Sequence, residues 1–401
     1  MAVTLKPIRR VVTGNDERGQ SRVVWDGAAP NARPAEMIPP RGCTDLWVWN
    51  DMPALLDGAE DLGNRPYDFP GPIGGGHLRV VQSQGRPDPY DPAQDPSIVP
   101  MHEPKAMQGG RRWDRGGNNA YSSGVHKTES VDYAILIEGE RTLVLDDREV
   151  TFGQGDIIVQ VGAWHQWKSL QSSGLVAYDM MSARFLDGAP GLAQGDNKVI
   201  QPDPARKLPP GITGARRIVT IDREPGRSSL VCDGPTPDVR IDLARPGFSS
   251  ARIWVTDSAP AKIVAETLHL PHTIEPPPNG SVLRTLTIPP DDAWKGKVGA
   301  AEVKAYFHAM GSPGASMYSP QAPHPYMQKT RSLDFVAVLN GEIVLVLDTQ
   351  EVALKAGDFV IQRGTSHSWS NRSGQSALLA IASHDGRWSR EGIRLRFVGH
   401  P

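Results

Sequence analysis

The sequence predicts an all-β protein made of two related halves, and three observations carry that prediction. A long internal repeat runs through the chain. Inside each repeat, short apolar runs alternate with turn residues, which is typical of β-structure. Gly 41 and Pro 36 together approach a fifth of the 401 residues, and such a composition favours a protein of many turns over a helical one.

The repeat is visible at two constant offsets. The run RRVVT at 9–13 recurs as RRIVT at 216–220, an offset of 207 residues that also relates Trp47 to Trp254. Further along the offset is 202, and it relates Asp132, Gly155 and His165 to Asp334, Gly357 and His367. The change of offset falls in a variable region rich in Pro and Gly. A duplicated domain explains so many positions in register.

The domain boundaries follow from this repeat and from composition. The stretch between the halves is rich in Gly, Pro and Asp, as linkers are. We therefore expect an N-terminal domain at 1–190, a linker at 191–213 and a C-terminal domain at 214–385. The tail, 386–401, is expected to add an edge strand.

Strand and turn signals recur inside each half. At 131–145 and 333–347, two apolar runs flank a Gly, and Asn340-Gly341 between β-branched runs predicts a hairpin there. Further hairpins are expected at Asp146-Asp147 and at Asp348-Thr349. The next strand, 157–160, follows Gly155-Asp156. Short strands and close turns predict a sandwich or barrel.

Two motifs in each half resemble those of the cupin superfamily. In the first half, His126-Lys127-Thr128 leads to Asp132 and then to Gly139, and Gly155-Asp156 leads to Gly162 and His165. The first motif is similar to an HxTxxxDY-like subgroup of small bacterial and fungal cupins. The resemblance implies two tandem cupin barrels of the double-stranded β-helix, or jelly-roll, type: a bicupin. It says little about the reaction, because this fold hosts many chemistries.

The resemblance also implies a divalent metal inside the barrel, with Fe, Mn, Zn and Ni all open. Imidazole and carboxylate suit such metals, so His126, His165 and Asp132 are the expected ligands and catalytic residues. Residues two apart share a face of a strand, which would turn His126, Thr128 and Asp132 inward. Thr128 stands where the common pattern has a second histidine. The alternatives are two hydrogen-bonded histidines without metal and a structural Asp132.

The second half has a weaker version of the same site. Gln328 stands at the position of His126, while Asp334 and His367 match Asp132 and His165. His324 could restore a site if the strand bends there. We expect that this half has lost its metal and stabilises the pair.

Aromatic residues near the motifs predict a substrate pocket. Trp164, Tyr121 and Trp113, together with Thr128, are the candidate substrate-binding residues, and core packing is the alternative for each aromatic one. Trp167 recurs as Trp369 and is expected in the core.

Composition restricts the partners. The net charge is −2, without basic blocks that would indicate nucleic acid and without an apolar run long enough for a membrane span. The two cysteines, Cys43 and Cys232, do not make a disulfide framework, so a cytoplasmic protein is expected. A small molecule is the expected partner, and the chain is expected to be a monomer with an internal pseudo-dimer or a homodimer.

The leading functional hypothesis is a metal-dependent enzyme acting on a small organic molecule, aromatic or carboxylate-bearing. The metal would act as a Lewis acid for isomerisation, decarboxylation or elimination. An iron-dependent ring-cleaving dioxygenase is one alternative. A non-catalytic binding protein and a metal-free enzyme that uses His165 as general acid–base are two others.

Overall fold

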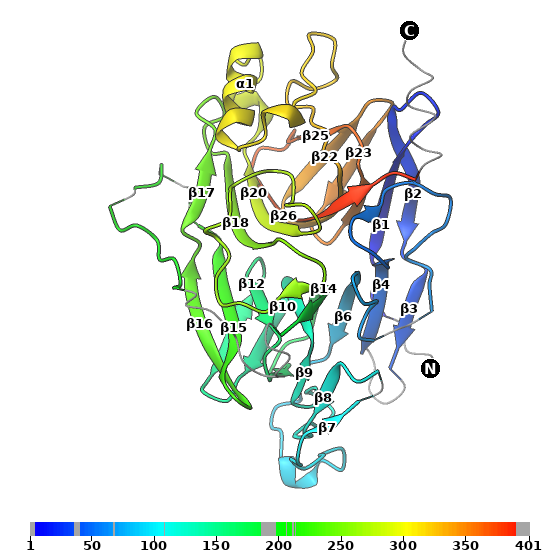
Figure 1. Ribbon diagram of the computed structural model, residues 1–401, viewed down its shortest axis with the longest axis vertical. Coiled ribbons are helices and arrows are strands. Elements are labelled where there is room, and N and C mark those ends of the chain that lie inside the picture. The colour runs from blue at the N-terminus through cyan, green and yellow to red at the C-terminus, as the bar shows by residue number, and fades with distance from the viewer. Residues whose placement is uncertain are drawn as a thin grey trace.

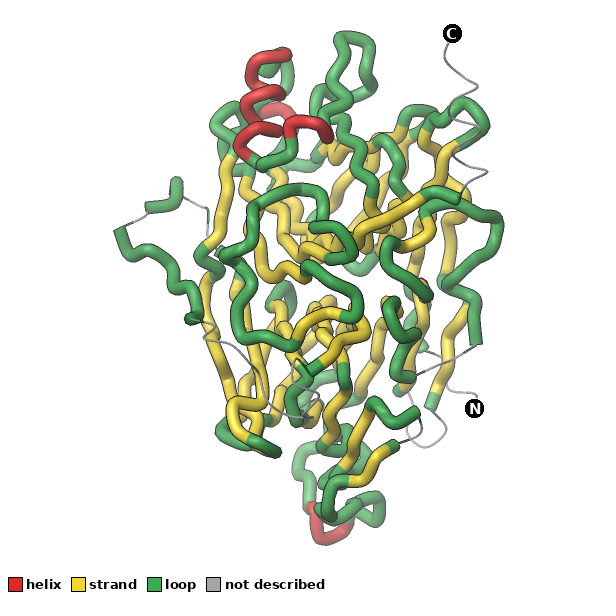
Figure 2. Tube along the Cα trace, in the orientation of Figure 1, coloured by secondary structure: helices red, strands yellow, loops and turns green. Residues whose placement is uncertain are grey.

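The chain folds almost entirely into β-strands and turns (Figure 2). The computed structural model describes residues 5–35, 41–66, 69–107, 109–185, 198–205, 207–210, 212 and 214–389. Within these ranges the helical segments are α1 (Ala300–Ala309) and the short 3₁₀ turns Pro92–Gln94, Asp291–Ala293 and Pro313–Ala315. In that part of the chain, no helix has both the length and the apolarity that crossing a membrane requires. The all-β prediction is confirmed.

One large sheet is built mainly from the first half. Its strands follow the order β16-β15-β12-β10-β14-β6-β4-β3. Their bounds are β3 (Asn31–Pro34), β4 (Gly42–Trp49), β6 (Gly76–Ser83), β10 (Ser130–Val144), β12 (Ile157–Val161), β14 (Gly174–Arg184), β15 (Arg216–Glu224) and β16 (Arg227–Pro235). Off this path, β11 (Glu149–Gly153) and β13 (Gln166–Lys168) pair with β10, and β19 (Ala261–Lys262) pairs with β14.

The other large sheet is built mainly from the second half. Its order is β17-β18-β20-β26-β21-β24-β1-β2, and β5 (Ala54–Leu55) pairs with β26. The bounds are β1 (Arg9–Asn15), β2 (Ser21–Ala28), β17 (Asp238–Ile241), β18 (Ser249–Thr256), β20 (Ser281–Ile288), β21 (Ser332–Asn340), β24 (Phe359–Arg363) and β26 (Ala377–Arg387).

Two small sheets complete the set. The first contains β22 (Glu342–Leu347), β23 (Glu351–Lys355) and β25 (His367–Ser370); the second contains β7 (Lys105–Ala106), β8 (Arg112–Asp114) and β9 (His126–Thr128). In the second half, the small sheet β23-β22-β25 and the large sheet enclose an apolar core. The described strands form separate sheets and do not close into hydrogen-bonded barrels. The tandem jelly-roll plan is confirmed in this open form.

The two halves exchange their N-terminal hairpins. The strand β1 runs parallel to β24 of the second half, and β15 runs parallel to β12 of the first half. Figure 1 shows the blue β1 and β2 beside the upper, C-terminal part of the molecule. The exchange is fastened by matching ion pairs. Arg9 Nη1 lies 2.9 Å from Asp358 Oδ2, and Arg216 Nη1 lies 2.8 Å from Asp156 Oδ2.

Alternation along the strands builds three main cores. One face of β10, with Tyr133, packs against the corresponding face of β21, with Phe335, and forms the core shared by both halves. The opposite face of β10 lines the interior of the first half, which includes Ala134, Trp167 and Tyr178. The interior of the second half is a separate and larger apolar cluster that α1 helps to cover.

The hairpins predicted around Gly139 and Asn340-Gly341 are wrong. Gly139 lies inside the continuous strand β10, and the strands on either side of Gly341 pair with other partners. Gly139 has φ 79° and Gly341 has φ 78°, which glycine adopts without strain. After these glycines the chain changes its strand partners: β10 pairs with β11 and β13, and β22 pairs with β23 and β25. The hairpins at Asp146-Asp147 and Asp348-Thr349 are confirmed by the pairing of β10 with β11 and of β22 with β23.

The domain boundaries stay predictions. Within the predicted linker, 191–197, 206, 211 and 213 lie outside the described residues, as do 390–401 of the predicted tail.

Candidate functional site

Two histidines of the first half lie side by side. His126 begins β9, and its backbone forms an antiparallel bridge with His165, with both N···O distances at 2.9 Å. Directly opposed residues of such a bridge project on the same face. The two imidazole centroids are 4.3 Å apart, and both side chains are buried. The two imidazole rings therefore lie next to each other in the interior of the first half.

Hydrogen bonds orient both rings in the same way. The Nδ1 atom of His126 lies 2.7 Å from the carbonyl oxygen of Gly124, and that of His165 lies 2.8 Å from that of Ala163. A carbonyl only accepts, so Nδ1 carries the proton in each ring and Nε2 keeps its lone pair. Burial lowers the pKa of His126 well below its usual value and that of His165 to about 4. Both rings are therefore neutral at neutral pH.

The pair fits part of a metal site. A histidine that donates from Nδ1 to a backbone carbonyl and keeps Nε2 free is oriented as metal-binding histidines are. Among the described residues, however, no group of three or more His, Cys, Asp or Glu side chains comes close enough to hold a metal. Asp132 is buried on β10, and its Oδ1 has no partner within the described structure. Burial raises the pKa of Asp132 to about 7.

A carboxylate from the second half fastens the backbone beside both histidines. Asp222 on β15 receives a hydrogen bond from the ammonium of Lys127 at 2.6 Å and another from the backbone N–H of Trp164 at 2.9 Å. Lys127 follows His126, and Trp164 precedes His165. The Lys127 and Asp222 side chains are only 3% and 2% exposed. Because Asp222 holds both neighbours, it fixes the separation of the two strands that carry the imidazoles.

The predicted pocket residues divide between two faces. In the pairing of β8 with β9, Arg112 stands opposite Thr128 and Trp113 stands opposite Lys127. Thr128 therefore shares the histidine face, and Trp113 projects from the other face. Trp164 directly precedes His165 in the sequence. Its ring lies against Arg115, whose guanidinium carbon is 4.6 Å from the ring centroid. Tyr121 contacts Tyr90 in a loop, with centroids 5.6 Å apart.

Sequence reasoning missed three residues of the interior around the pair, namely Trp167, Tyr178 and Arg141. Trp167, expected only as core, has its ring 5.4 Å from His165 and 5.4 Å from Tyr178. Burial raises the pKa of Tyr178 to about 12. The Arg141 guanidinium lies 5.9 Å from the Trp167 ring, and its charge contributes to lowering the pKa of His126. The sequence offered one signal for Arg141: it lies two residues before the apolar Leu143, so a charged residue and an apolar one share one face of the strand.

In the second half, the same backbone frame holds a different pair. Gln328 bridges His367 as His126 bridges His165, but its side-chain Nε2 lies 3.1 Å from Nε2 of His367. Nδ1 of His367 faces the Thr365 carbonyl at 2.9 Å, so its Nε2 is the acceptor and Gln328 is the donor. The lone pair that would bind a metal is engaged.

The other second-half candidates do not join this pair. Nδ1 of His324 lies 2.6 Å from Ser368 Oγ and accepts from the backbone N–H of Tyr326, so the ring turns toward Trp294, 5.6 Å away. Asp334 is buried with its Oδ1 unpartnered, as Asp132 is. The cavity beside Gln328 measures about 20 Å³, room for roughly one water molecule.

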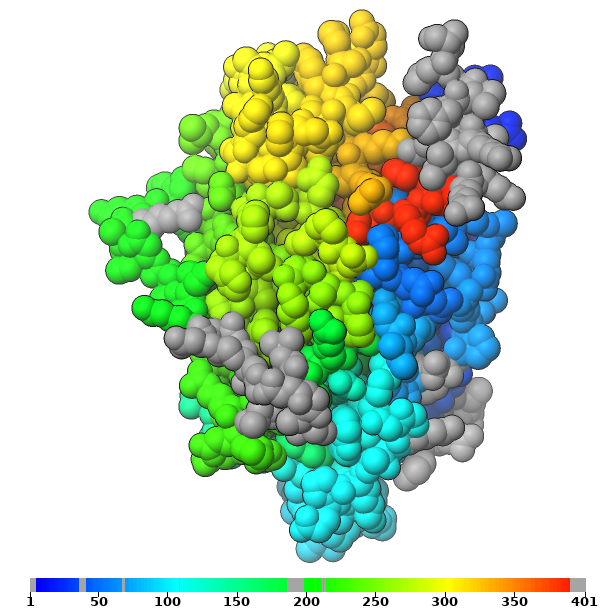
Figure 3. Space-filling view, viewed as in Figure 1, coloured from blue at the N-terminus to red at the C-terminus, as the bar shows by residue number. Residues whose placement is uncertain are grey.

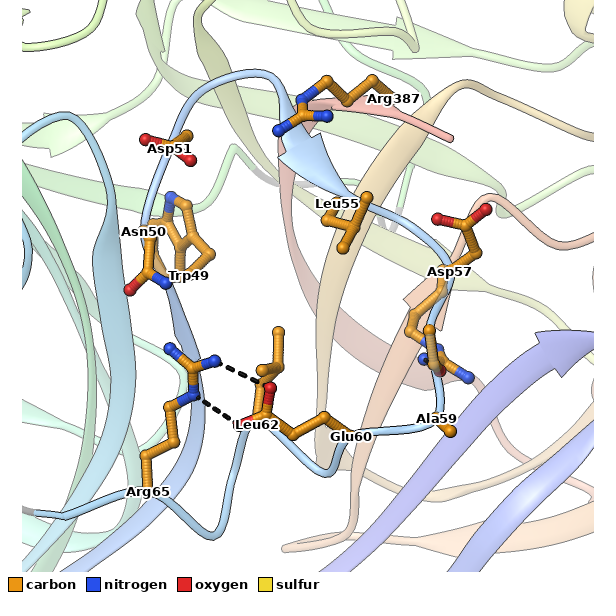
Figure 4. A pocket seen from close by; sticks show the side chains of 12 residues that line it. Trp49, Asn50, Asp51, Leu55, Asp57, Ala59, Glu60, Leu62, Arg65 and Arg387 are labelled. Carbon is orange, nitrogen blue, oxygen red and sulfur yellow. Dashed lines mark hydrogen bonds and ion pairs between the residues drawn. The ribbon is translucent and has the colours of Figure 1, made fainter. Parts of the chain in front are cut away.

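A larger cavity lies elsewhere, where the two halves meet. It measures about 210 Å³ and is lined by the segment from the end of β4 through β5 and the loop after it, including Trp49, Leu55 and Leu62, together with Arg363 of β24 and Arg387 of β26. Figure 4 shows Arg65 bonded to Glu60 on one side and Arg387 on the opposite side. In Figure 3, the blue N-terminal and red C-terminal surfaces adjoin. Its lining shares no residue with the histidine pair.

Comparison with curated proteins gives short matches. The chain is 56% identical over 48 residues to the phomopsin biosynthesis cluster protein C' of Diaporthe leptostromiformis, which covers 12% of this chain and 25% of the relative. It is 42% identical over 60 residues to the cupin-domain-containing oxidoreductase virC of Hypocrea virens, which covers 15% of this chain and 31% of the relative. The chain thus matches less than a third of the length of either relative. No family model matches it.

Comparison with solved structures gives long but distant matches. A salicylate 1,2-dioxygenase variant from Pseudoaminobacter salicylatoxidans is 10% identical with a TM-score of 0.35, covering 77% of this chain and 71% of the other. A cupin 2 conserved barrel protein from Leptotrichia buccalis is 8% identical with a TM-score of 0.28, covering 72% and 98%. TM-scores of this size do not establish a common fold by themselves. The duplicated motifs and the paired β-sheets of this chain resemble those of the cupin superfamily, and one segment of the chain matches part of a cupin-domain-containing protein.

Proposed function

We propose that the chain is a metal-dependent cupin enzyme that acts on a small organic molecule in its first half. His126 and His165 would hold the divalent metal through Nε2, and the second half would be structural. The single observation that carries this proposal is the common orientation of the two neutral rings, each donating from Nδ1 to a backbone carbonyl.

The proposed site combines an open cation position with a buried wall. When bound, the metal would supply Lewis-acid polarisation of a carbonyl or carboxylate. Trp167 and Tyr178 provide a buried aromatic surface beside His165, which excludes water and suits a planar substrate. Asp132 is buried on the same interior face and is proposed as a further ligand or as a proton carrier. Isomerisation, decarboxylation and elimination are the reactions we propose first.

The second candidate is an oxidoreductase, such as an iron-dependent ring-cleaving dioxygenase. The observation that favours it is the partial match to a relative whose name describes it as a cupin-domain-containing oxidoreductase. A cytoplasmic location and a monomeric or homodimeric state stay predictions from the sequence.

The test uses protein purified without an affinity tag. Metal content is measured for the wild type, for His126→Ala with His165→Ala, and for His367→Ala as the matched control from the second half. We expect about one metal per chain in the wild type and in the control, and loss in the double variant. Retention of the metal in the double variant would overturn the proposal.

The reaction classes separate by oxygen dependence. Aromatic and carboxylate-bearing compounds are screened for turnover with and without dioxygen. Turnover without oxygen removes the dioxygenase. Oxygen uptake by the iron-loaded protein favours it. Ligand binding without any turnover under either condition would instead assign a non-catalytic binding protein.

A further inference from the structure

The interior of the first half contains a buried cation without a counter-ion. Arg141 on β10 is 5% exposed, and its Nε and Nη1 atoms have no hydrogen-bond partner within the described part of the chain. Among the described residues Arg141 also forms no ion pair, whereas the buried Arg217 is paired with the carboxylate of Glu266. Buried charges are normally paired, because an unpaired one loses its hydration. Such an orphaned guanidinium indicates a partner supplied from outside the chain.

Further positive charge gathers around the same place. The charge of Arg141 contributes to lowering the pKa of Arg41, after the effect of burial, so the two guanidinium groups lie within electrostatic range. Arg112 on β8 shares the histidine face and contributes to lowering the pKa of both His126 and His165. Three guanidinium groups, those of Arg41, Arg112 and Arg141, therefore act on this part of the interior.

The second half does not repeat this arrangement. At the offset of 202 residues, the position of Arg141 is taken by Ile343, which is buried in an apolar cluster. That half also has Gln328 in place of His126, and its cavity holds only about one water molecule. The unpaired arginine and the free imidazole pair therefore occur together in one half.

From this placement, the geometry points to Arg141 as the anchor for the carboxylate of a small organic acid whose other end reaches His126 and His165. The inference rests on the proposed function and names its substrate class. A guanidinium binds a carboxylate with two parallel hydrogen bonds, which fixes direction as well as charge. The Trp167 ring lies 5.9 Å from the Arg141 guanidinium and contacts His165, so it provides an aromatic surface between the anchor and the imidazoles.

The experiment measures binding of benzoate and of its neutral analogue benzamide by calorimetry. Both probes carry one ring, and only benzoate carries the anion. We expect the wild type to bind benzoate at least tenfold more tightly than benzamide, and Arg141→Met to lose that preference. The matched control is Arg284→Met, which removes a buried arginine of the second half whose Nε is also unpartnered. It should keep the preference.

Several results would overturn the inference. These are a wild type without preference for benzoate, Arg141→Met with the preference retained, or a loss of preference in Arg284→Met. Should Arg141→Met fail to fold, Arg141→Lys keeps the charge without the two parallel bonds, and unchanged benzoate affinity in it would count against the anchor. A lower melting temperature in Arg141→Met together with retained preference would assign the residue to packing.

Metal content separates this inference from the proposed function. Arg141→Met should bind as much metal as the wild type, because Arg141 is not among the proposed ligands. Benzoate preference in a protein that binds no metal would leave the anchor standing and reject the metal-dependent enzyme. A protein that binds stoichiometric metal but does not prefer benzoate would leave the proposed metal site standing and reject Arg141 as the carboxylate anchor.

Discussion

Replacement of Asp222 by alanine is expected to destabilise the protein and to disturb the histidine pair. Asp222 is 95 residues from its partner Lys127 in the sequence. The substitution leaves the Lys127 ammonium buried without a counter-ion and removes the acceptor of the Trp164 N–H. Breaking a buried ion pair costs about 3–5 kcal/mol, and an orphaned buried N–H adds about 1–3 kcal/mol. Because burial already lowers the pKa of Lys127, deprotonation will relieve part of this, and we expect a total near 4 kcal/mol.

The assay is chemical unfolding of the variant, with metal affinity measured in parallel. Asn15 is the matched control, since it stands at the position of Asp222 in the first repeat. Its Oδ1 has no partner within the described residues, so Asn15→Ala should cost less than about 1 kcal/mol. The double variant Lys127→Met with Asp222→Leu separates stability from positioning. An apolar pair of similar volume often restores stability, but it cannot accept the Trp164 N–H.

We therefore expect the double variant to regain stability while its metal affinity stays at least tenfold below that of the wild type. The reasoning is refuted if Asp222→Ala costs no more than Asn15→Ala. It is also refuted if the apolar double variant binds metal as tightly as the wild type.

Three further predictions follow from the second half and from the hairpin exchange. Gln328→His should raise the metal content from one to two ions per chain. The Nε2 atoms of Gln328 and His367 are 3.1 Å apart, and two ligand atoms of one tetrahedral or octahedral ion are separated by roughly 3.0–3.4 Å. An unchanged metal content would show that this part of the second half does not suit a metal. Burial lowers the pKa of His324 to about 3 in the folded protein. The neutral side chain therefore contributes its full stability above the unfolded-state pKa near 6.5, and this contribution is lost as the pH falls below that value. Between pH 7 and 5 the fall in unfolding free energy should be about 2 kcal/mol smaller in His324→Asn than in the wild type. An equal fall in unfolding free energy in both proteins would contradict this. The fragments 1–190 and 214–385, expressed separately, should each aggregate or dimerise, because each large sheet needs the hairpin of the other half. Co-expression of the two fragments should restore a soluble complex. Two monodisperse, monomeric fragments would contradict this prediction.

The repeated motifs predicted the parts of the fold that both halves share. Strand alternation placed His126, Thr128 and Asp132 in the interior, because a two-residue period determines the face of each residue, and all three are buried. The same patterns cannot identify which strand pairs with which. The exchange of hairpins, with β1 beside β24, therefore could not be predicted, since parallel pairing between distant segments leaves no local signal.

The positions of several site residues could not be predicted from the sequence for related reasons. Asp222 belongs to the opposite repeat, so no motif of the first half contains it. Trp113 was expected beside the histidines, but its face depends on the register of β8 against β9, which pairs it with Lys127. Gly139 looked like a hairpin turn because a bend and a turn both require positive φ. Arg141 could have been noticed as the residue that breaks an apolar face matched by Ile343 in the second half.

The most direct test is an anomalous-scattering crystal structure of tag-free protein loaded with a divalent metal. The account predicts one peak in the first half, about 2.0–2.2 Å from Nε2 of both His126 and His165, and no peak beside His367. A fully occupied metal bound elsewhere, or no metal between these two rings at saturating concentration, would contradict it.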